Sequence, residues 1–286
     1  MTLNNIDLGH VTLQVSDLER SIQYYELILG LTLIRRTDGV ADLGTVDGTT
    51  VLVSLREKKG VRPVSHPPLL GLYHFAILVP DRAALGRFVA HLADLHIKVG
   101  AADHLVSEAL YLHDSDGLGI EVYADRPRET WETVDGQLRM TSDPLDFKGL
   151  IKAGGEVPWA GMPAGTRMGH VHLHVGDLDR ASRFYSGALG LERRVWSYPG
   201  ALFLAADGYH HHLGLNTWAG PSARVASGDD AKLLEWRMAL DSPAAVSAVA
   251  ARIADDGYSV SRVGDDQLIE DPWGTRLRLT TQHATD

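Results

Sequence analysis

Cysteine is absent from this chain of 286 residues. Its absence excludes disulfides, thiolate nucleophiles and zinc–sulfur sites, so any bound metal ion must be held by nitrogen and oxygen atoms. Basic residues are in the minority, because 27 Lys and Arg stand against 37 Asp and Glu and give a net charge of −10. This negative charge argues against nucleic acid or an anionic membrane surface as the main partner.

Long apolar runs are also missing, since none approaches the roughly 18 residues that a membrane-spanning helix needs. The first residues, MTLNNIDLGH, lack the basic and apolar segments of a signal peptide, so we expect a cytoplasmic protein. At about 150 residues per domain, the length predicts two domains with substantial cores. Histidine is the one residue type in unusual abundance, with 14 copies, and it directs the search for a site.

The chain contains an internal repeat. Residues 9–31 and 169–191 are identical at twelve of 23 positions when they are aligned with a shift of 160 and no gap. Each copy begins with the period-2 alternation of a strand and continues with apolar residues at the three- and four-residue steps of a helix. In the first copy Ser16 or Asp17 is a candidate N-cap and Gly30 a candidate C-cap. Short strand-like runs follow the helix, which predicts a βαβββ module.

Four such modules fill most of the chain and predict a fold of the α+β class. We expect the modules at residues 7–60, 71–125, 168–218 and 232–283. They group into an N-terminal domain, 7–125, and a C-terminal domain, 168–283. The linker between them, 126–167, contains several prolines and one predicted short helix near 145–153.

The repeated motifs resemble those of the vicinal oxygen chelate superfamily. The resemblance is carried by the GHV start of each repeat, by the Leu-Gly-Leu helix ends at 29–31 and 189–191, and by the D-x-x-G…E pattern that closes the second module. This superfamily includes glyoxalases, bleomycin-resistance proteins and extradiol dioxygenases, and four modules in one chain is most similar to the catechol-2,3-dioxygenase type. The resemblance implies that the modules pair into two curved-sheet, barrel-like cups, with a divalent metal on the inner strands.

The resemblance also implies that metal ligands come from the first and last strands of two paired modules. The candidates at those places are His10, His74, His170 and Trp236 on first strands, and Thr49 or Thr50, Glu121, His212 and Arg278 on last strands. The fourth module thus offers a tryptophan and a cation where ligands would stand. Glu121 is the remaining carboxylate, and with two histidines it would leave three open positions on octahedral iron(II) for a bidentate catecholate and dioxygen.

Two ligand sets are open at this point. The first and second modules would give His10, His74 and Glu121, whereas the second and third would give His74, His170 and Glu121. Extradiol dioxygenases resemble one another in carrying a histidine on the last strand of the module that provides the first ligand. The third module has such a histidine, His212, and the first has none. The resemblance therefore favours His74, His170 and Glu121, with the second and third modules sharing one cup and the other two forming an inactive partner.

Three further residues are expected to be catalytic because of the same resemblance. His212 would be the acid–base residue, and Tyr111, ten residues before Glu121, would bond the substrate oxygen. His104, upstream of Tyr111, would orient the aromatic ring or guard the pocket.

Other histidines compete for these places. In the run Tyr-His-His-His that ends at His212, alternation makes His210 the competitor and predicts that His211 points away. On the first strand of the third module, His172 and His174 share a face with the expected ligand and could substitute for it.

The expected function is extradiol ring cleavage of catechol or a substituted catechol by dioxygen, with iron(II) as cofactor. Manganese(II) suits the same ligand set. Related enzymes often assemble, which implies a homo-oligomer. Two alternatives stay open. One is a glyoxalase-like lyase or isomerase, whose sites usually hold four protein ligands, two of them acidic. The other is a metal-free binding protein akin to the antibiotic-sequestering members of the superfamily.

Overall fold

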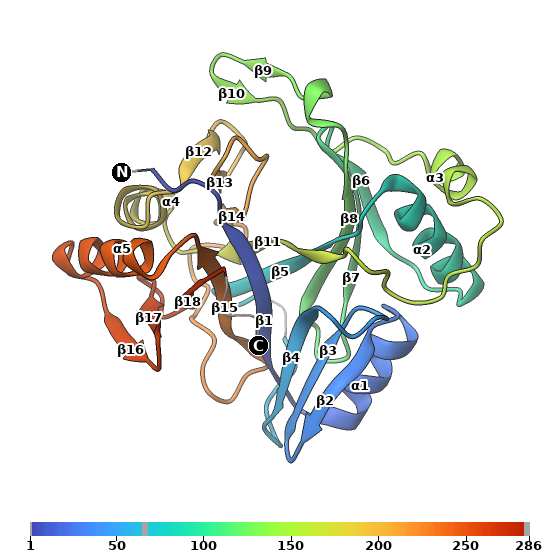
Figure 1. Cartoon of the computed structure of the whole chain (residues 1–286), viewed down its shortest axis with the longest axis horizontal. Helices are drawn as coiled ribbons and strands as arrows, with labels where there is room; N and C mark the ends of the chain where they lie inside the picture. Colours follow the sequence, from blue (N-terminus) through green and yellow to red (C-terminus); the bar gives the residue numbers. More distant parts are fainter. Residues whose placement is uncertain (1, 65–67, 283–286) are drawn as a thin grey trace.

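A computed structural model of the chain describes residues 2–64 and 68–282. Four successive βαβββ modules follow one another along these residues (Figure 1). The first module contains β1 (Asp7–Val15), α1 (Leu18–Leu27), β2 (Thr32–Thr37), β3 (Val40–Gly44) and β4 (Val51–Glu57). The second contains β5 (Gly71–Leu78), α2 (Arg82–Asp94), β6 (Gly100–Asp103), β7 (Ser107–His113) and β8 (Gly119–Asp125).

The two C-terminal modules repeat this order. The third contains β11 (Arg167–His174), α4 (Leu178–Ser182), the π-helical turn η2 (Arg183–Ala188), β12 (Glu192–Val195), β13 (Ala201–Ala205) and β14 (Leu213–Asn216). The fourth contains β15 (Lys232–Leu240), α5 (Pro243–Asp255), β16 (Val260–Val263), β17 (Asp266–Glu270) and β18 (Arg276–Thr281). The final position expected for this module, 283, lies outside the described residues. Of the helices in the described part of the chain, none combines the length and apolar character required to cross a bilayer.

Repeated side-chain caps start the helices of the first and third modules. The carboxylate of Asp17 accepts a hydrogen bond from the backbone N–H of Arg20 at 3.0 Å, and that of Asp177 accepts one from Arg180 at 2.6 Å. Each bond satisfies one of the backbone donors that the first turn of a helix leaves without a partner. The cap expected at 16 or 17 is therefore Asp17.

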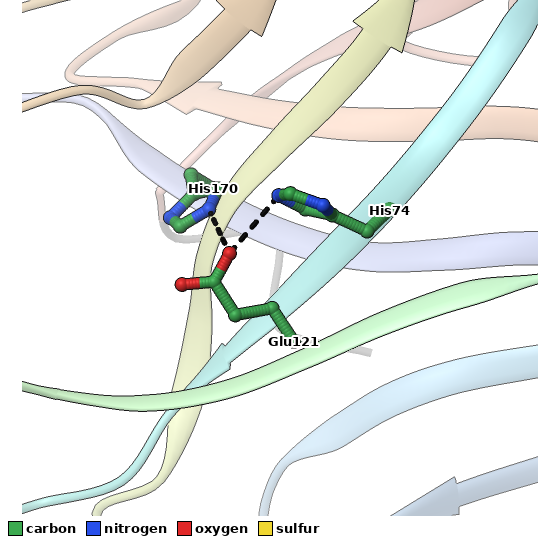
Figure 2. Close-up of side chains that lie close together, drawn as sticks. All are labelled: His74, Glu121 and His170. Atoms are coloured by element: carbon green, nitrogen blue, oxygen red, sulfur yellow. Dashed lines mark hydrogen bonds and ion pairs between the residues drawn. The ribbon is translucent and has the colours of Figure 1, made fainter. Parts of the chain in front are cut away.

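Strands of the second and third modules form one curved sheet, which we call the first sheet. Its strand order is β6-β7-β8-β5-β11-β14-β13-β12, and its centre is the antiparallel pair β5–β11. Figure 2 shows these two strands crossing with His74 and His170 directed toward one another. The pairing of the second with the third module agrees with the arrangement that the ligand set implied.

The first and fourth modules form the second sheet in the same way. Its strand order is β2-β3-β4-β1-β15-β18-β17-β16, centred on the antiparallel pair β1–β15. The two sheets are continuous through one contact between β1 and β11, at the pair Leu8 and Met168. The last strands of the first and third modules, β4 and β14, each pair in parallel with the first strand of their own module.

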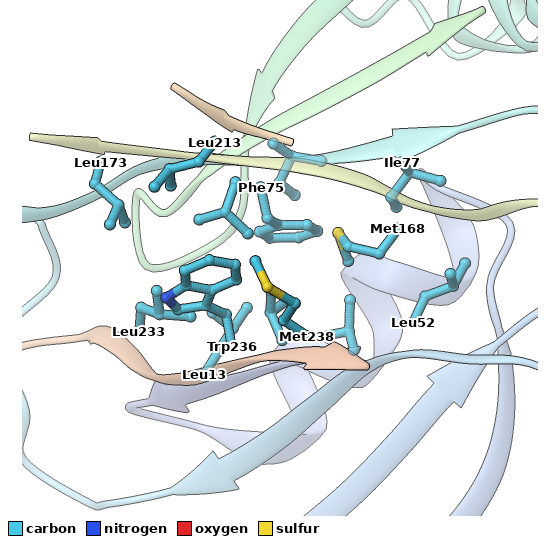
Figure 3. Close-up of a cluster of buried hydrophobic side chains, with 14 of the residues drawn as sticks. Leu13, Leu52, Phe75, Ile77, Met168, Leu173, Leu213, Leu233, Trp236 and Met238 are labelled. Atoms are coloured by element: carbon cyan, nitrogen blue, oxygen red, sulfur yellow. The ribbon is translucent and has the colours of Figure 1, made fainter. Parts of the chain in front are cut away.

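The hydrophobic core lies between the two sheets. Phe75, Ile77 and Met168 from the first sheet face Trp236 and Met238 from the second (Figure 3). Because side chains alternate along a strand, the residues between Phe75 and Ile77 and between Trp236 and Met238 point to the opposite, concave face of each sheet. The apolar layer thus determines which residues are available to a site on the concave face.

The linker between the second and third modules has structure of its own. It contains the 3-10 turn η1 (Arg128–Thr130), a hairpin of β9 (Thr133–Val134) and β10 (Gln137–Leu138), and the helix α3 (Phe147–Gly154). The helix lies close to the expected 145–153 and packs on α2, where a Cβ added to Gly86 would come within 2.0 Å of the carbonyl oxygen of Leu150. The hairpin was not expected from the sequence.

Two buried tyrosine–aspartate hydrogen bonds connect the sheets to one another. Tyr25 of α1 donates to Asp114 in the β7–β8 turn at 3.1 Å, and Tyr185 of η2 donates to Asp271 in the β17–β18 turn at 2.9 Å. Each bond joins a helix of one sheet to a turn of the other. The tyrosine that both sequence repeats share, Tyr25 and Tyr185, therefore connects the two sheets through a hydrogen bond in each repeat.

Replacing Tyr25 by Phe should destabilise the protein in a pH-dependent way. Burial raises the pKa of Asp114 to about 6, so its carboxylate is ionised and in need of donors only at higher pH. We expect a loss of about 1–3 kcal/mol in the free energy of unfolding at pH 8, because a buried acceptor loses its partner. The loss should shrink as the pH falls below about 6, where the carboxyl group becomes protonated in the folded state.

Urea unfolding at pH 8 and pH 5 measures this difference. The same substitution in an Asp114→Ala background provides the control, because it should have little further effect once the acceptor is gone. An equal loss in both backgrounds would show that the hydroxyl acts through something other than Asp114.

Candidate metal centre

Strand register brings three candidate ligands together on the concave face of the first sheet. In the β5–β11 pair His170 lies opposite Ala76, and His74 lies opposite His172. The parallel pairing of β5 with β8 places Glu121 beside Ala76. The two histidines and the glutamate therefore come from three adjacent strands and meet around one small residue.

The three side chains form a compact buried group, which we call the triad: His74, Glu121 and His170 (Figure 2). Oε2 of Glu121 is 3.0 Å from Nε2 of His74 and 3.1 Å from Nε2 of His170. The three residues are at most 5% exposed. Across the described residues, this is the one group of three or more His, Asp or Glu side chains close enough to hold a metal ion together.

The geometry of the triad fits a divalent cation. Donor atoms at right angles, each about 2.1 Å from one octahedral ion, lie about 3.0 Å from one another. Nε2 of His74 is buried without a hydrogen-bond partner among the described residues, even though the carboxylate is 3.0 Å away. The nitrogen is therefore not aligned with that oxygen, as expected when both atoms are directed at a shared third partner.

Protonation of the triad favours metal binding as well. Burial lowers the pKa of both His74 and His170, which keeps the imidazoles neutral near pH 7. Burial acts to raise the pKa of Glu121, but the neighbouring imidazoles of His170 and His74 outweigh it and hold that pKa well below its ordinary value. Neutral imidazoles and an ionised carboxylate are the forms that ligate metals.

The second sheet has an ion pair where the first has the triad. The β1–β15 and β15–β18 pairings place Glu235 at the position equivalent to His74 and Arg278 at the position equivalent to Glu121. The guanidinium of Arg278 donates two hydrogen bonds of 2.8 Å to the carboxylate of Glu235. The alignment that placed Trp236 at a ligand position was one residue off, since Trp236 faces the apolar core. His10, on β1, lies in this second sheet.

A cavity of about 170 Å³ adjoins the triad. Residues of both modules and of the linker line it: Tyr73, His74, Ala102, His104, Tyr111, Glu121, Met140, Thr141, Ser142, His172, Tyr198, Phe203, His211 and Trp218. A register shift in the β5–β11 pair at His172 and Leu173 makes Tyr73 an extra residue, so it faces the cavity beside His74 instead of the core. The sequence analysis did not foresee Tyr73, Phe203 or the linker residues in this wall.

His104 and Tyr111 lie together in the cavity wall. Nδ1 of His104 is 2.5 Å from the carbonyl oxygen of Thr141, and Nε2 is 2.6 Å from the hydroxyl of Tyr111. Since a carbonyl only accepts, Nδ1 of His104 carries the proton and Nε2 accepts from Tyr111. The phenolic oxygen keeps its lone pairs for a ligand. Burial and the charge of Glu121 raise the pKa of Tyr111 well above its ordinary value, so the hydroxyl stays protonated.

His211, and not His212, faces the triad. The ring of His211 lies 4.1 Å from that of His170, between centroids, and lines the cavity. His212 instead lines a different cavity, with Arg167 and Asp207, and burial lowers its pKa to about 3. The prediction for these two residues was wrong because β14 starts only at Leu213. The preceding residues lie in an irregular bend, where strand alternation does not apply.

His172 and His174 do not belong to the triad. Asn216 on β14 lies between them, with its side-chain nitrogen 3.0 Å from Nε2 of His172 and its oxygen 2.6 Å from Nδ1 of His174. Burial lowers the pKa of both histidines. The pair therefore forms a neutral, hydrogen-bonded part of the cup, in which His172 lines the cavity. No spacing in the sequence pointed to Asn216.

Comparison with known proteins agrees with this architecture. Residues 7–122 and 167–279 match the family model of the Glyoxalase/Bleomycin resistance protein/Dioxygenase superfamily. The chain belongs to this superfamily. Among its members, a catechol-2,3-dioxygenase of Bacillus subtilis (strain 168) is 41% identical to this chain over 268 residues, which cover 93% of each protein. The family resemblance seen in the sequence is thus confirmed.

Solved structures show the same superfamily fold. A putative dioxygenase from Bacillus subtilis subsp. subtilis str. 168 has a TM-score of 0.68 at 15% identity, covering 99% of this chain and 87% of that one. Glyoxalase I from Zea mays has a TM-score of 0.58 at 19% identity, covering 97% and 92%. These likenesses confirm the α+β fold of paired modules.

Replacing Glu121 by Ala should abolish stoichiometric metal binding. The substitution removes the only carboxylate from the triad and leaves two neutral imidazoles for the ion. Metal content after loading with iron(II) or manganese(II) and gel filtration is the measurement.

His10→Ala is the matched control, because His10 occupies the repeat-equivalent position of His170 but lies in the second sheet. It should retain the metal content of the unchanged protein. Full metal content in Glu121→Ala, or loss of the metal in His10→Ala, would contradict the assignment of the triad.

Proposed function

We propose that this protein is a metal-dependent extradiol dioxygenase that opens the ring of catechol or a substituted catechol beside its two hydroxyl groups. The proposal rests on the triad of two imidazoles and one carboxylate next to a small cavity with acid–base side chains. Such a ligand set holds one face of an octahedral ion and leaves three positions for substrates. The 41% identical relative named as a catechol-2,3-dioxygenase supports the same reaction.

Iron(II) is the cofactor that we propose for the triad, and manganese(II) suits the same ligands. Bound there, the ion would lower the pKa of a catechol hydroxyl and allow electrons to pass from the aromatic ring to dioxygen. His74, His170 and Glu121 would hold it. The side chains of the three ligands are buried, which limits the access of water to them.

Tyr111 and His104 would orient the substrate. The hydroxyl of Tyr111 donates a hydrogen bond to Nε2 of His104, so its phenolic oxygen can accept a hydrogen bond from a substrate hydroxyl. The bond from His104 to the Thr141 carbonyl fixes this direction of donation. Together they would hold one substrate oxygen in place and keep its proton directed at Tyr111.

His211 would serve as the acid–base residue, in the role first expected of His212. Burial lowers the pKa of His211 well below its ordinary value, so the ring is neutral and able to accept a proton from a substrate hydroxyl. Its position against His170 places it beside the triad. The same ring could return the proton to the oxygen that is reduced.

The cavity favours a single aromatic ring. Its volume of about 170 Å³ is below the roughly 300–1,000 Å³ of sites that hold larger ligands. Tyr73, Phe203 and Trp218 provide aromatic walls, against which a flat ring can pack.

The alternatives receive less support. A glyoxalase-like site with two acidic ligands is not what the described residues offer, because Glu121 is the only acidic member of the triad. A metal-free binding protein would not need the triad. The cytoplasmic location and the homo-oligomer stay predictions.

Anaerobic loading with iron(II), followed by catechol and air, should give a yellow ring-fission product. Extradiol opening leaves a conjugated semialdehyde, whose visible absorbance measures turnover directly. Protein that takes up neither iron nor manganese but still binds catechol would favour the binding-protein alternative. Isomerisation of a hemithioacetal in place of ring cleavage would favour the glyoxalase-like alternative.

Substituting the two neighbouring histidines separately tests the acid–base assignment. His211→Phe should lower kcat by about 10²–10⁴ while iron binding is retained, since this is the usual contribution of an acid–base group. His212→Phe is the matched control and should lower kcat less than tenfold, because His212 lines another cavity. Steady-state ring cleavage with parallel iron analysis measures both. The reverse order of effects would return the role to His212.

A further inference from the structure

A chain of hydrogen bonds leads from His211 away from the triad to a carboxylate. Nδ1 of His211 is 2.8 Å from Nδ1 of His210, and Nε2 of His210 is 2.9 Å from Oδ1 of Asp125. His210 is fully buried, whereas the side chain of Asp125 is 25% exposed at the far end. Asp125 is the last residue of β8, the strand that also carries Glu121.

The direction of these bonds follows from what each group can donate. An ionised carboxylate only accepts, so Asp125 requires the proton of His210 to sit on Nε2. When each imidazole carries one proton, Nδ1 of His210 is then an acceptor and Nδ1 of His211 must be the donor. That arrangement leaves Nε2 of His211 without a proton, as the basic atom of a ring that lines the cavity.

We propose that His210 and Asp125 are positioning residues that fix the tautomer and the orientation of His211. Neither residue lines the cavity, and both act through the bond to Nδ1 of His211. The catalytic consequence rests on the proposed function, because it assumes that His211 accepts a proton from the substrate. The tautomer itself does not depend on the reaction.

The surroundings hold the chain of bonds in place. The ring of Tyr209 lies 4.0 Å from that of His210, between centroids, and its hydroxyl is 3.0 Å from Oδ2 of Asp125. The hydroxyl of Tyr123 on β8 lies 2.8 Å from the hydroxyl of Tyr209. The consecutive residues Tyr209, His210 and His211 therefore all contact this network, which accounts for the aromatic and histidine run in the sequence.

Asp125→Asn tests the proposal because it keeps the shape of the side chain and can reverse the bonds. An amide can donate to Nε2 of His210, which moves that proton to Nδ1 and makes Nδ1 of His211 the acceptor. His211 would then carry its proton on Nε2 and lose its basic atom in the cavity. In the Ser-His-Asp catalytic triad of serine proteases, the corresponding Asp-to-Asn change also selects the wrong histidine tautomer and lowers kcat by about 10⁴-fold.

Two measurements on the full chain are needed. The first is ¹⁵N NMR of histidine side chains in protein loaded with zinc(II), a diamagnetic ion that imidazole and carboxylate bind. The signals of His211 are identified by their loss in His211→Phe. The second is ring cleavage by iron(II)-loaded protein. We expect kcat in Asp125→Asn to fall at least tenfold with KM within threefold of the unchanged protein, and NMR to show the His211 proton moving from Nδ1 to Nε2.

Tyr209→Phe is the matched control, since it removes a neutral hydroxyl from Asp125 but leaves the bond to His210. It should keep the His211 tautomer and a kcat within threefold. A proton on Nε2 of His211, or two protons on His210, in the unchanged protein would overturn the proposal whatever the activity. So would a normal kcat in an Asp125→Asn variant whose tautomer has changed. If NMR shows the expected tautomer but catechol is never cleaved, the positioning of His211 stands and the proposed reaction is wrong.

Discussion

The antiparallel pairing of β5 with β11 is the constraint on which the site depends. It joins modules that are far apart in the chain and puts His74 and His170 on one face. A slip of one residue would turn these side chains into the apolar layer around Phe75. Burial of the apolar residues and convergence of the ligands therefore require the same register, and the core between the sheets stabilises the geometry of the triad.

Duplication has given the two sheets different tasks. The first combines polar donors on its concave face with a cavity, whereas the second fills the equivalent place with the Arg278–Glu235 pair. A guanidinium beside a carboxylate satisfies there the negative charge that a metal ion would otherwise balance. The second sheet still supports the first, through the shared core and through the Tyr25–Asp114 and Tyr185–Asp271 bonds.

Sequence predicted the triad well because its members lie inside strands that repeat from module to module. The module repeat fixes the positions there, so the offset of Glu121 from the turn glycine and the repeat of GHV were sufficient. Prediction failed at His211 and His212, which precede β14 in an irregular bend, and at Trp236, where the alignment of the fourth module was one residue off. At the histidine run the side-chain direction depends on local backbone geometry that residue spacing does not report.

The sequence by itself determined the four modules, the aspartate caps, the negative charge and the exclusion of sulfur ligands, since these depend on residue type and short-range periodicity. It also determined which carboxylate could serve the site. Tertiary structure decided which histidine of the Tyr-His-His-His run faces the cavity, that the linker supplies Thr141 to fix His104, and that Asp125 reaches His210. Those contacts join segments distant in the chain, and only the packing of the sheet and its loops sets their distances.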